Sequence, residues 1–299
     1  LVLASIFSFI GVASALAFFV NEVSLGALQI SQFIFVFGAV LRFRSASEGL
    51  FHQLASMHSD GIFVCELHDF LTIQPIIQDK PSAVSIQPDT TPNIVFDDVW
   101  FRYREDQSWI LKGISLKIPC GRKLAIVGDN GAGKSTLVKL LCRFYDPTKG
   151  RVLIDGVDLR EIRINSWWDT LGCLFQDFHG YILTAKDSIA LGDVHSELDF
   201  PRVVEAGGKA GVDAMMTDWE HGWDQLIGRG YSDAVELSAG QHQRLALARL
   251  FYRDPRIMLL DEPTSWVDVP TEGKIFRALR ESTKDRTLIF ISHRFSTVR

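Results

Sequence analysis

The chain has 299 residues, of which 47% are hydrophobic and 22% charged, and its formal net charge at pH 7 is −5. This composition is typical of a globular protein and excludes a disordered or fibrous chain. The mildly acidic balance gives no support to a nucleic acid partner. The four cysteines are scattered without C-x-x-C spacing, which argues against a zinc site or a disulfide framework.

The first 41 residues contain a single ionisable side chain, that of Glu22. Two uncharged runs, residues 1–20 and 23–41, lie on either side of Asn21 and Glu22. A helix of about 20 residues spans about 30 Å, the hydrocarbon thickness of a bilayer. We therefore predict a transmembrane helical hairpin with a polar turn at Asn21–Glu22. A signal peptide is disfavoured because no basic segment precedes the apolar run, whereas a buried hairpin of a soluble protein remains an alternative.

Arg42 and Arg44 follow the second apolar run directly, and the positive-inside rule places them in the cytoplasm. The helical pattern continues to about residue 71, which predicts that the second helix extends into the cytosol. Prolines then cluster as expected for an extended linker. The predicted organisation is a membrane segment over residues 1–74, a proline-rich linker over 75–92 and a separate domain over 93–299.

From Asn93 onward, short apolar strands alternate with helical stretches, which predicts an α/β domain. Residues 128–135 read Gly-Asp-Asn-Gly-Ala-Gly-Lys-Ser, between an apolar strand at 124–127 and a helix at 136–141. This is the pattern G-x-x-x-x-G-K-[ST] in the strand–loop–helix context of a phosphate-binding loop, or P-loop. The alternative is a glycine-rich turn with an incidental lysine.

The P-loop predicts an ATP site with bound Mg²⁺. Glycines allow successive N–H groups to point at phosphate oxygens, and the following helix N-terminus adds positive potential. Lys134 is expected to reach the β- and γ-phosphates, and the Ser135 hydroxyl to bind Mg²⁺. The remaining predicted contacts to the nucleotide in this segment come from Gly128, Asn130, Gly131, Gly133 and Thr136.

A pair of carboxylates follows the apolar strand at residues 257–260. Asp261, at the end of this strand, is placed to reach Mg²⁺, usually through water. Glu262 lies one residue further and is the candidate base that activates the attacking water. The alternative is an acidic strand end that caps the next loop.

Residues 237–241 read Leu-Ser-Ala-Gly-Gln and open a helix that carries Gln243, Arg244 and Arg249. Here the sequence resembles the ATP-binding cassette (ABC) family, whose signature is LSGGQ followed by a QR-rich helix. The resemblance extends from about residue 94 to the end of the chain and implies the fold of an α/β P-loop NTPase, the ABC ATPase domain. The front resembles the last two membrane helices of an exporter-type half-transporter. We therefore expect a fragment, with a nucleotide-binding domain at 93–299 that is truncated at its C-terminus.

The resemblance implies catalytic roles for two further residues. Gln176 resembles the Q-loop residue near Mg²⁺ or water, and would act with Lys134 and Glu262. His293 matches the switch histidine near the γ-phosphate. Each residue also has a simpler explanation, because Gln176 could be a buried amide and His293 a hydrogen-bonded core histidine.

Other implied contacts concern the base and the partner cassette. Tyr103 matches the aromatic residue that stacks on adenine, although it could be an ordinary strand aromatic. Asp268 lies where the D-loop belongs, but the family more often has small residues at the two preceding positions. The signature residues Ser238, Gly240 and Gln241 are expected to face the γ-phosphate bound by a second cassette.

Ala239 departs from the signature, because it replaces the first glycine of LSGGQ. A methyl group at this position could crowd the phosphate or restrict φ. We expect a functional site with weakened hydrolysis.

The function implied by these motifs is ATP hydrolysis that drives transport, in the direction of export, of an unidentified substrate. The expected partners are a second half-transporter (identical or different) and membrane lipid, with the chain in a plasma or bacterial inner membrane and its cassette in the cytoplasm. One alternative is a soluble cassette ATPase acting on nucleic acid or ribosomes, which membrane fractionation would distinguish. Another is a membrane-anchored ATP-binding switch without turnover, which an ATPase assay would distinguish.

Overall fold

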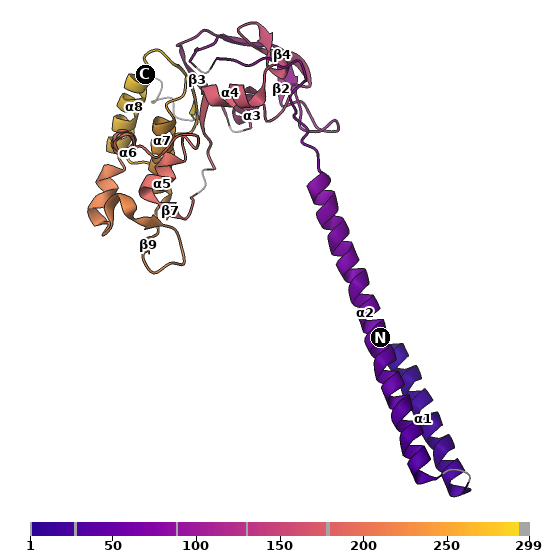
Figure 1. Ribbon diagram of the computed structural model, residues 1–299. Helices are drawn as coiled ribbons and strands as arrows, with labels where there is room; N and C mark the ends of the chain where they lie inside the picture. Colours follow the sequence, from indigo (N-terminus) through magenta and orange to yellow (C-terminus); the bar gives the residue numbers. More distant parts are fainter. Residues whose placement is uncertain (1, 27–28, 88, 130, 178–179, 293–299) are drawn as a thin grey trace. The chain divides into compact units, whose positions relative to one another are not determined.

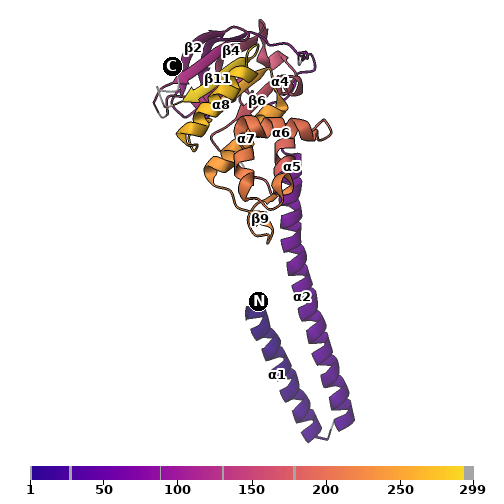
Figure 2. The ribbon, with the colours of Figure 1, turned by 90° about the vertical axis from the view of Figure 1, so that its left-hand side faces the viewer.

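The computed structural model describes the chain except residues 1, 27–28, 88, 130, 178–179 and 293–299. The chain divides into two compact units, Leu1–Pro75 and Ile76–Arg299. The first unit consists of two helices, α1 (Val2–Ser24) and α2 (Ile30–Thr72) (Figures 1 and 2). The rings of Phe19 and Phe33 join them edge to face with 6.3 Å between centroids.

The predicted turn at Asn21–Glu22 is wrong, because both residues lie inside α1. Neither side chain breaks a helix, and the Asn21 carbonyl accepts a hydrogen bond from the N–H of Leu25 at 3.1 Å. The helix instead stops before Gly26, whose φ of 74° is the left-handed conformation common after a helix end. Glycine adopts this conformation without a steric penalty, so it ends the helix more effectively than a polar side chain.

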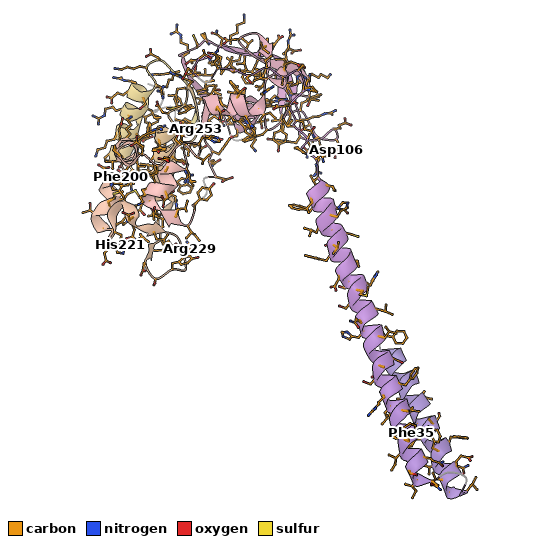
Figure 3. All side chains as sticks on the ribbon, viewed as in Figure 1. Phe35, Asp106, Phe200, His221, Arg229 and Arg253 are labelled. Carbon is orange, nitrogen blue, oxygen red and sulfur yellow. The ribbon has the colours of Figure 1, made fainter. Side chains whose placement is uncertain are left out.

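In the part of the chain that the structure describes, no helix is both long and apolar enough to cross a membrane. The long helix α2 has no buried residue, and its apolar side chains, such as Phe35, project from the helix (Figure 3).

The described residues between 76 and 93, at the start of the second unit, form no helix and pack on the rest of that unit. Val84 donates its N–H to the Glu161 carbonyl at 2.9 Å and accepts from the N–H of Arg163 at 2.8 Å. Asp79 accepts a hydrogen bond from the N–H of Ile164 at 2.9 Å. Main-chain hydrogen bonds at Val84 and a side-chain hydrogen bond at Asp79 therefore attach this proline-rich stretch to the rest of the second unit.

The second unit contains two four-stranded sheets. One is antiparallel, in the order β2 (Leu111–Ile118), β1 (Ile94–Phe101), β4 (Lys149–Ile154) and β5 (Val157–Asp158). The other is parallel, in the order β3 (Lys123–Val127), β11 (Thr287–Ser292), β10 (Ile257–Asp261) and β6 (Leu171–Leu174). All five residues of β10 are buried, as expected for a central parallel strand covered on both faces.

Helices and short strands complete the unit. The α-helices are α3 (Lys134–Leu141), α4 (Ile164–Thr170), α5 (Ala185–Ala190), α6 (Phe200–Ala210), α7 (Ala239–Arg253) and α8 (Val269–Ser282). The 3₁₀ segments are η1 (Leu159–Glu161), η2 (Asp213–Asp218) and η3 (Gly222–Asp224). A small three-stranded sheet consists of β7 (Leu183–Thr184), β8 (Leu226–Ile227) and β9 (Ala234–Val235).

Two hydrophobic cores meet at β10. Its residues Ile257 and Leu259 belong to the core that includes α3 and the antiparallel sheet, whereas Met258 and Leu260 belong to the core that includes α5, α6 and α7. This alternation follows from the period of two residues in a strand. The strand therefore fixes the position of its carboxyl end, where the acidic pair begins, relative to α3 and α7.

Candidate active site

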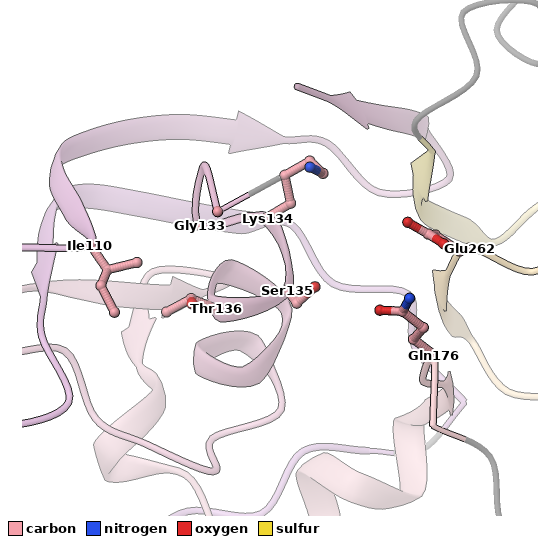
Figure 4. Close-up of a pocket in the computed structure, with 8 residues that line it drawn as sticks. Ile110, Gly133, Lys134, Ser135, Thr136, Gln176 and Glu262 are labelled. Atoms are coloured by element: carbon pink, nitrogen blue, oxygen red, sulfur yellow. The ribbon is translucent and has the colours of Figure 1, made fainter. Parts of the chain in front are cut away.

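The carboxyl ends of the parallel strands bring several of the predicted residues together. β3 ends just before the P-loop, β10 ends at Asp261, and β6 ends two residues before Gln176. Carboxyl ends of parallel strands share one edge of the sheet, where ligands of such folds bind. A pocket of about 620 Å³ opens there (Figure 4), lined by Ile110, Gly131, Gly133, Lys134, Ser135, Thr136, Gln176 and Glu262.

The P-loop needs glycine most clearly at Gly133. Its φ is 88°, and a Cβ atom there would lie 2.8 Å from Cδ2 of Leu111 in β2. This glycine directly precedes α3, so it permits both the backbone turn and the close approach to the antiparallel sheet. The first N–H groups of α3 lack partners within the helix and are suited to binding an anion. This loop is therefore the candidate phosphate site of the structure, and the predicted residue Asn130 lies outside the described residues.

Lys134 is buried and folds over its own loop. Its Nζ donates to the carbonyl oxygens of Gly128 at 2.7 Å and Asp129 at 2.8 Å. These contacts hold an ammonium group at the pocket wall (Figure 4). A cation kept in place by weak neutral acceptors can exchange them for the charged oxygens of a phosphate, because charge-assisted hydrogen bonds are stronger.

Tyr103 lies beside α3, although it is not among the pocket-lining residues. Its hydroxyl lies 3.3 Å from Oγ1 of Thr136. Its ring packs edge to face against Phe101 and Tyr145, with centroid separations of 5.0 and 5.1 Å. Its side chain remains partly exposed, so the structure places this aromatic residue next to the helix that carries the P-loop lysine.

The acidic pair occupies two different environments. Asp261 is 5% exposed at the end of β10, while Glu262 is half-buried and lines the pocket. Glu262 has a φ of 54°, a left-handed conformation that costs of order 1–3 kcal/mol for a non-glycine residue. Its N–H donates to the carbonyl of Ile291 in β11 at 3.1 Å. The predicted His293 follows β11 but lies outside the described residues.

The signature residues lie at the N-terminus of α7, where they cap the helix. Ser238 Oγ accepts from the N–H of Gln241 at 3.3 Å, and Gln241 Oε1 accepts from the N–H of Ser238 at 2.8 Å. This reciprocal pair is a capping box. Asp268 is the N-cap of α8, and its Oδ2 accepts hydrogen bonds from the N–H and the hydroxyl of Thr271 at 3.1 and 3.0 Å. These hydrogen bonds hold the pKa of Asp268 below its usual value.

The structure therefore separates the predicted residues into two groups. Lys134, Ser135, Gln176 and Glu262 converge on the pocket, together with Gly131, Gly133 and Thr136. The pocket-lining residues of the described chain do not include the predicted residues of the signature region and D-loop, Ser238, Gly240, Gln241 and Asp268. They also do not include Tyr103, Gly128 and Asp261, which lie in segments next to the pocket.

Of the two effects considered for the Ala239 methyl group, the structure does not support a restriction of φ. Ala239 is the first residue of α7, and its φ is not among the positive values found at non-glycine residues. An alanine is well suited to a helix, so its Cβ imposes no backbone strain. The next position, in contrast, requires glycine for packing, because a Cβ on Gly240 would lie 2.3 Å from the Trp266 carbonyl oxygen.

Comparison with known proteins identifies the family of the chain. A sequence model of the family described as "ABC transporter" matches residues 111–265, more than half of the chain. The chain belongs to the ABC transporter family. Its relatives include the ATP-dependent lipid A-core flippase of Chromohalobacter salexigens, which is 36% identical over 280 residues that make up 94% of this chain and 44% of that protein.

Two further ABC transporters show similar coverage. The mitochondrial iron-sulfur clusters transporter ABCB7 of Rattus norvegicus is 34% identical over 297 residues, 98% of this chain and 38% of that protein. A solved structure of a bacterial Atm1-family ABC exporter with ATP bound has a TM-score of 0.75 and 32% identity, and the match covers 98% of this chain and 51% of that chain. The chain thus spans 38% of the length of the first and 51% of the length of the second.

Two residues of this ABC transporter chain were not predicted near the site: Ile110, which lines the pocket, and Gln243, which contacts the backbone of Glu262. Gln243 in α7 is 2% exposed, and its side-chain amide bonds to the backbone of Glu262 and Trp266. The available sequence signal was that Gln243 stands among the apolar residues of the α7 pattern. A buried amide at such a position needs hydrogen-bond partners. The sequence did not indicate which backbone groups it would meet.

Proposed function

We propose that this chain binds ATP with Mg²⁺ in the pocket at the end of the parallel sheet and hydrolyses it to drive transport across a membrane. The observation that carries the proposal is the convergence of Lys134, Ser135, Gln176 and Glu262, from three separate segments, on one pocket (Figure 4). A phosphate-binding helix N-terminus, a cation and a carboxylate are the groups that phosphoryl transfer to water requires.

The oxygen donors near the pocket fit Mg²⁺. Ser135 offers a hydroxyl and Gln176 an amide oxygen in the pocket lining. Asp261, which directly precedes the lining residue Glu262, is proposed to add a carboxylate, usually through water. Mg²⁺ prefers oxygen ligands and keeps several waters. When bound, the ion would neutralise phosphate charge. Lys134 would exchange its carbonyl partners for phosphate oxygens, and Tyr103 would stack on adenine beside α3.

Glu262 is proposed as the general base that accepts a proton from the attacking water. Its carboxylate and the Lys134 ammonium lie at the same pocket, so a γ-phosphate held by the lysine would be within the reach of water oriented by the glutamate (Figure 4). His293 is proposed to contact the same phosphate. The carboxylate thus acts from one side of the pocket and the P-loop from the other.

A second cassette is proposed to complete the site. Ser238, Gly240, Gln241 and Asp268 would face ATP bound by that partner, identical or different in sequence. Similarity to the solved Atm1-family ABC exporter with ATP bound supports a transport role. The two uncharged runs in residues 1–41 support a membrane-spanning hairpin in contact with lipid, with the cassette in the cytoplasm of a bacterial inner or other plasma membrane. The proposed direction of transport is export, and the substrate is unidentified.

The direct test is the variant Glu262→Gln in the purified full-length protein. It should bind ATP as the unchanged protein does but release no phosphate, because the amide cannot accept the proton. The matched control is Glu281→Gln, an exposed carboxylate near the end of α8, which should hydrolyse ATP normally. Near-normal hydrolysis by Glu262→Gln would refute the proposed base, and absence of the protein from membrane fractions would refute the transport role.

A further inference from the structure

The buried amide of Gln243 connects α7 to the turn that follows β10, residues 262–266. Its Nε2 donates to the carbonyl of Glu262 at 2.9 Å and to Ser265 Oγ at 3.4 Å. Its Oε1 accepts from the N–H of Trp266 at 3.1 Å. With only 2% of the residue exposed, water is no substitute for these partners, so both ends of the amide are committed to one turn.

The Glu262 backbone is held from two sides. Its N–H donates to the carbonyl of Ile291 in β11, and its carbonyl accepts from Gln243 and also from the Ser265 hydroxyl at 3.2 Å. Its φ of 54° is one that a non-glycine residue keeps only when the surroundings impose it. Because φ sets the direction of the Cα–Cβ bond, the contacts that hold this conformation also aim the carboxylate.

The start of α7 lies directly against the same turn. Gly240 and Gln243 are three residues apart and therefore share a face of the helix. A Cβ on Gly240 would lie 2.3 Å from the Trp266 carbonyl oxygen, so the helix and the turn approach without room for a side chain at that position. Gln243 bonds the N–H of the same tryptophan. The two contacts fix the turn to the helix that carries the signature residues.

We propose that Gln243 is a positioning residue for hydrolysis: its amide holds the backbone of Glu262 and Trp266 and so keeps the Glu262 carboxylate directed at the γ-phosphate. A shift of α7 at its capped N-terminus is then transmitted through this amide to the base. The inference rests on the proposed role of Glu262 and adds the residue that sets its geometry.

Two substitutions separate the two ends of the amide. Gln243→Glu retains an acceptor for the Trp266 N–H but replaces the donor to the Glu262 carbonyl with a carboxylate oxygen. Gln243→Leu has a similar side-chain volume but removes both the donor and the acceptor of the amide. The matched control, Arg249→Met, lies on the same helix and loses hydrogen bonds to Ser188 at 3.0 and 3.1 Å, away from the turn.

The experiment measures kcat, the ATP dissociation constant, the melting temperature and amide exchange in purified full-length protein. Both Gln243 variants should lower kcat about ten- to hundredfold, the scale of a misplaced catalytic group, with ATP affinity changed by less than about twofold. Arg249→Met should lower the melting temperature without lowering kcat. The Trp266 amide should exchange faster in Gln243→Leu and keep its protection in Gln243→Glu.

Normal kcat in Gln243→Glu would overturn the inference while leaving the proposed function intact. Equal loss of kcat in Arg249→Met would also overturn it, because the effect would then be general destabilisation of α7. Absence of ATP turnover in the unchanged protein would instead contradict the proposed function, and the positioning role with it.

Discussion

The P-loop pocket and the N-termini of α7 and α8 are built in different ways. In the pocket, polar side chains from separate segments converge on a shared space. At the two N-termini, Ser238, Gln241 and Asp268 are used in capping the helices on which they stand. The pocket is thus recognisable as a candidate site from the convergence of side chains, whereas the structure shows only local hydrogen bonds for the residues at the two N-termini.

The largest effect is expected from Lys134→Met, which tests whether the pocket binds phosphate at all. The methionine keeps the length of the stem but removes the ammonium that now contacts Gly128 and Asp129. ATP affinity should fall at least about tenfold, since a charge-assisted bond to a charged group contributes about 1.5–3 kcal/mol. Titration calorimetry measures this, with the exposed Lys274→Met as control. Unchanged affinity would place the nucleotide elsewhere.

Gly240→Ala tests how closely the N-terminus of α7 packs against the turn that follows β10 and carries Glu262. The new Cβ would meet the Trp266 carbonyl oxygen at 2.3 Å, so the turn or α7 must move. We expect a loss of about 1–3 kcal/mol in the free energy of unfolding, the usual cost of overpacking, together with reduced hydrolysis. Denaturant unfolding measures the first effect and phosphate release the second. Full stability would show that α7 and the turn are less closely attached.

Ala239→Gly is the matched substitution at the neighbouring position. Because Ala239 is helical and exposed, the change should cost about 0.5–1 kcal/mol of helix stability or less and leave ATPase kinetics unchanged. Faster hydrolysis in Ala239→Gly would instead support crowding of the phosphate by the methyl group, as the departure from LSGGQ suggests.

Ser238→Ala removes the N-cap of α7. It distinguishes the capping role of Ser238 from its proposed role in contacting ATP bound by a second cassette. Loss of the capping bond alone should lower the free energy of unfolding by about 1 kcal/mol without affecting ATP binding to the isolated pocket. If Ser238 also contacts ATP of a second cassette, ATP-dependent dimerisation, measured by light scattering, should weaken. Unaltered dimerisation would assign the serine to capping only.

The smallest effect concerns pH and Asp268. Hydrogen bonds from Thr271 lower the pKa of this carboxyl, so its contribution to stability is present above the usual aspartate pKa and is lost as pH falls through the lowered value. An NMR titration should show that pKa below the ordinary range, and Thr271→Val should raise it toward that range. An unperturbed pKa would contradict the observed cap.

Much of the pocket could be predicted from sequence because its chemistry is local. The P-loop spacing and the acidic pair after an apolar strand depend on a few consecutive residues in a recognisable context. The contacts of Gln243 could not be predicted, because they join segments about twenty residues apart through a tertiary packing contact. The left-handed φ of Glu262 has the same origin, since its neighbours impose it. The prediction of a turn at Asn21–Glu22 was wrong because polar side chains alone do not end a helix.

The central claim, that the pocket binds ATP and that the signature region serves a second cassette, is tested most directly by a structure of the Glu262→Gln protein with Mg²⁺ and ATP. The account predicts phosphates at the N-terminus of α3, with Nζ of Lys134 moved from the carbonyls of Gly128 and Asp129 to the phosphates. It also predicts Ser238 of a second cassette facing the γ-phosphate. Nucleotide bound away from α3, or a γ-phosphate with no second signature region beside it, would contradict the account.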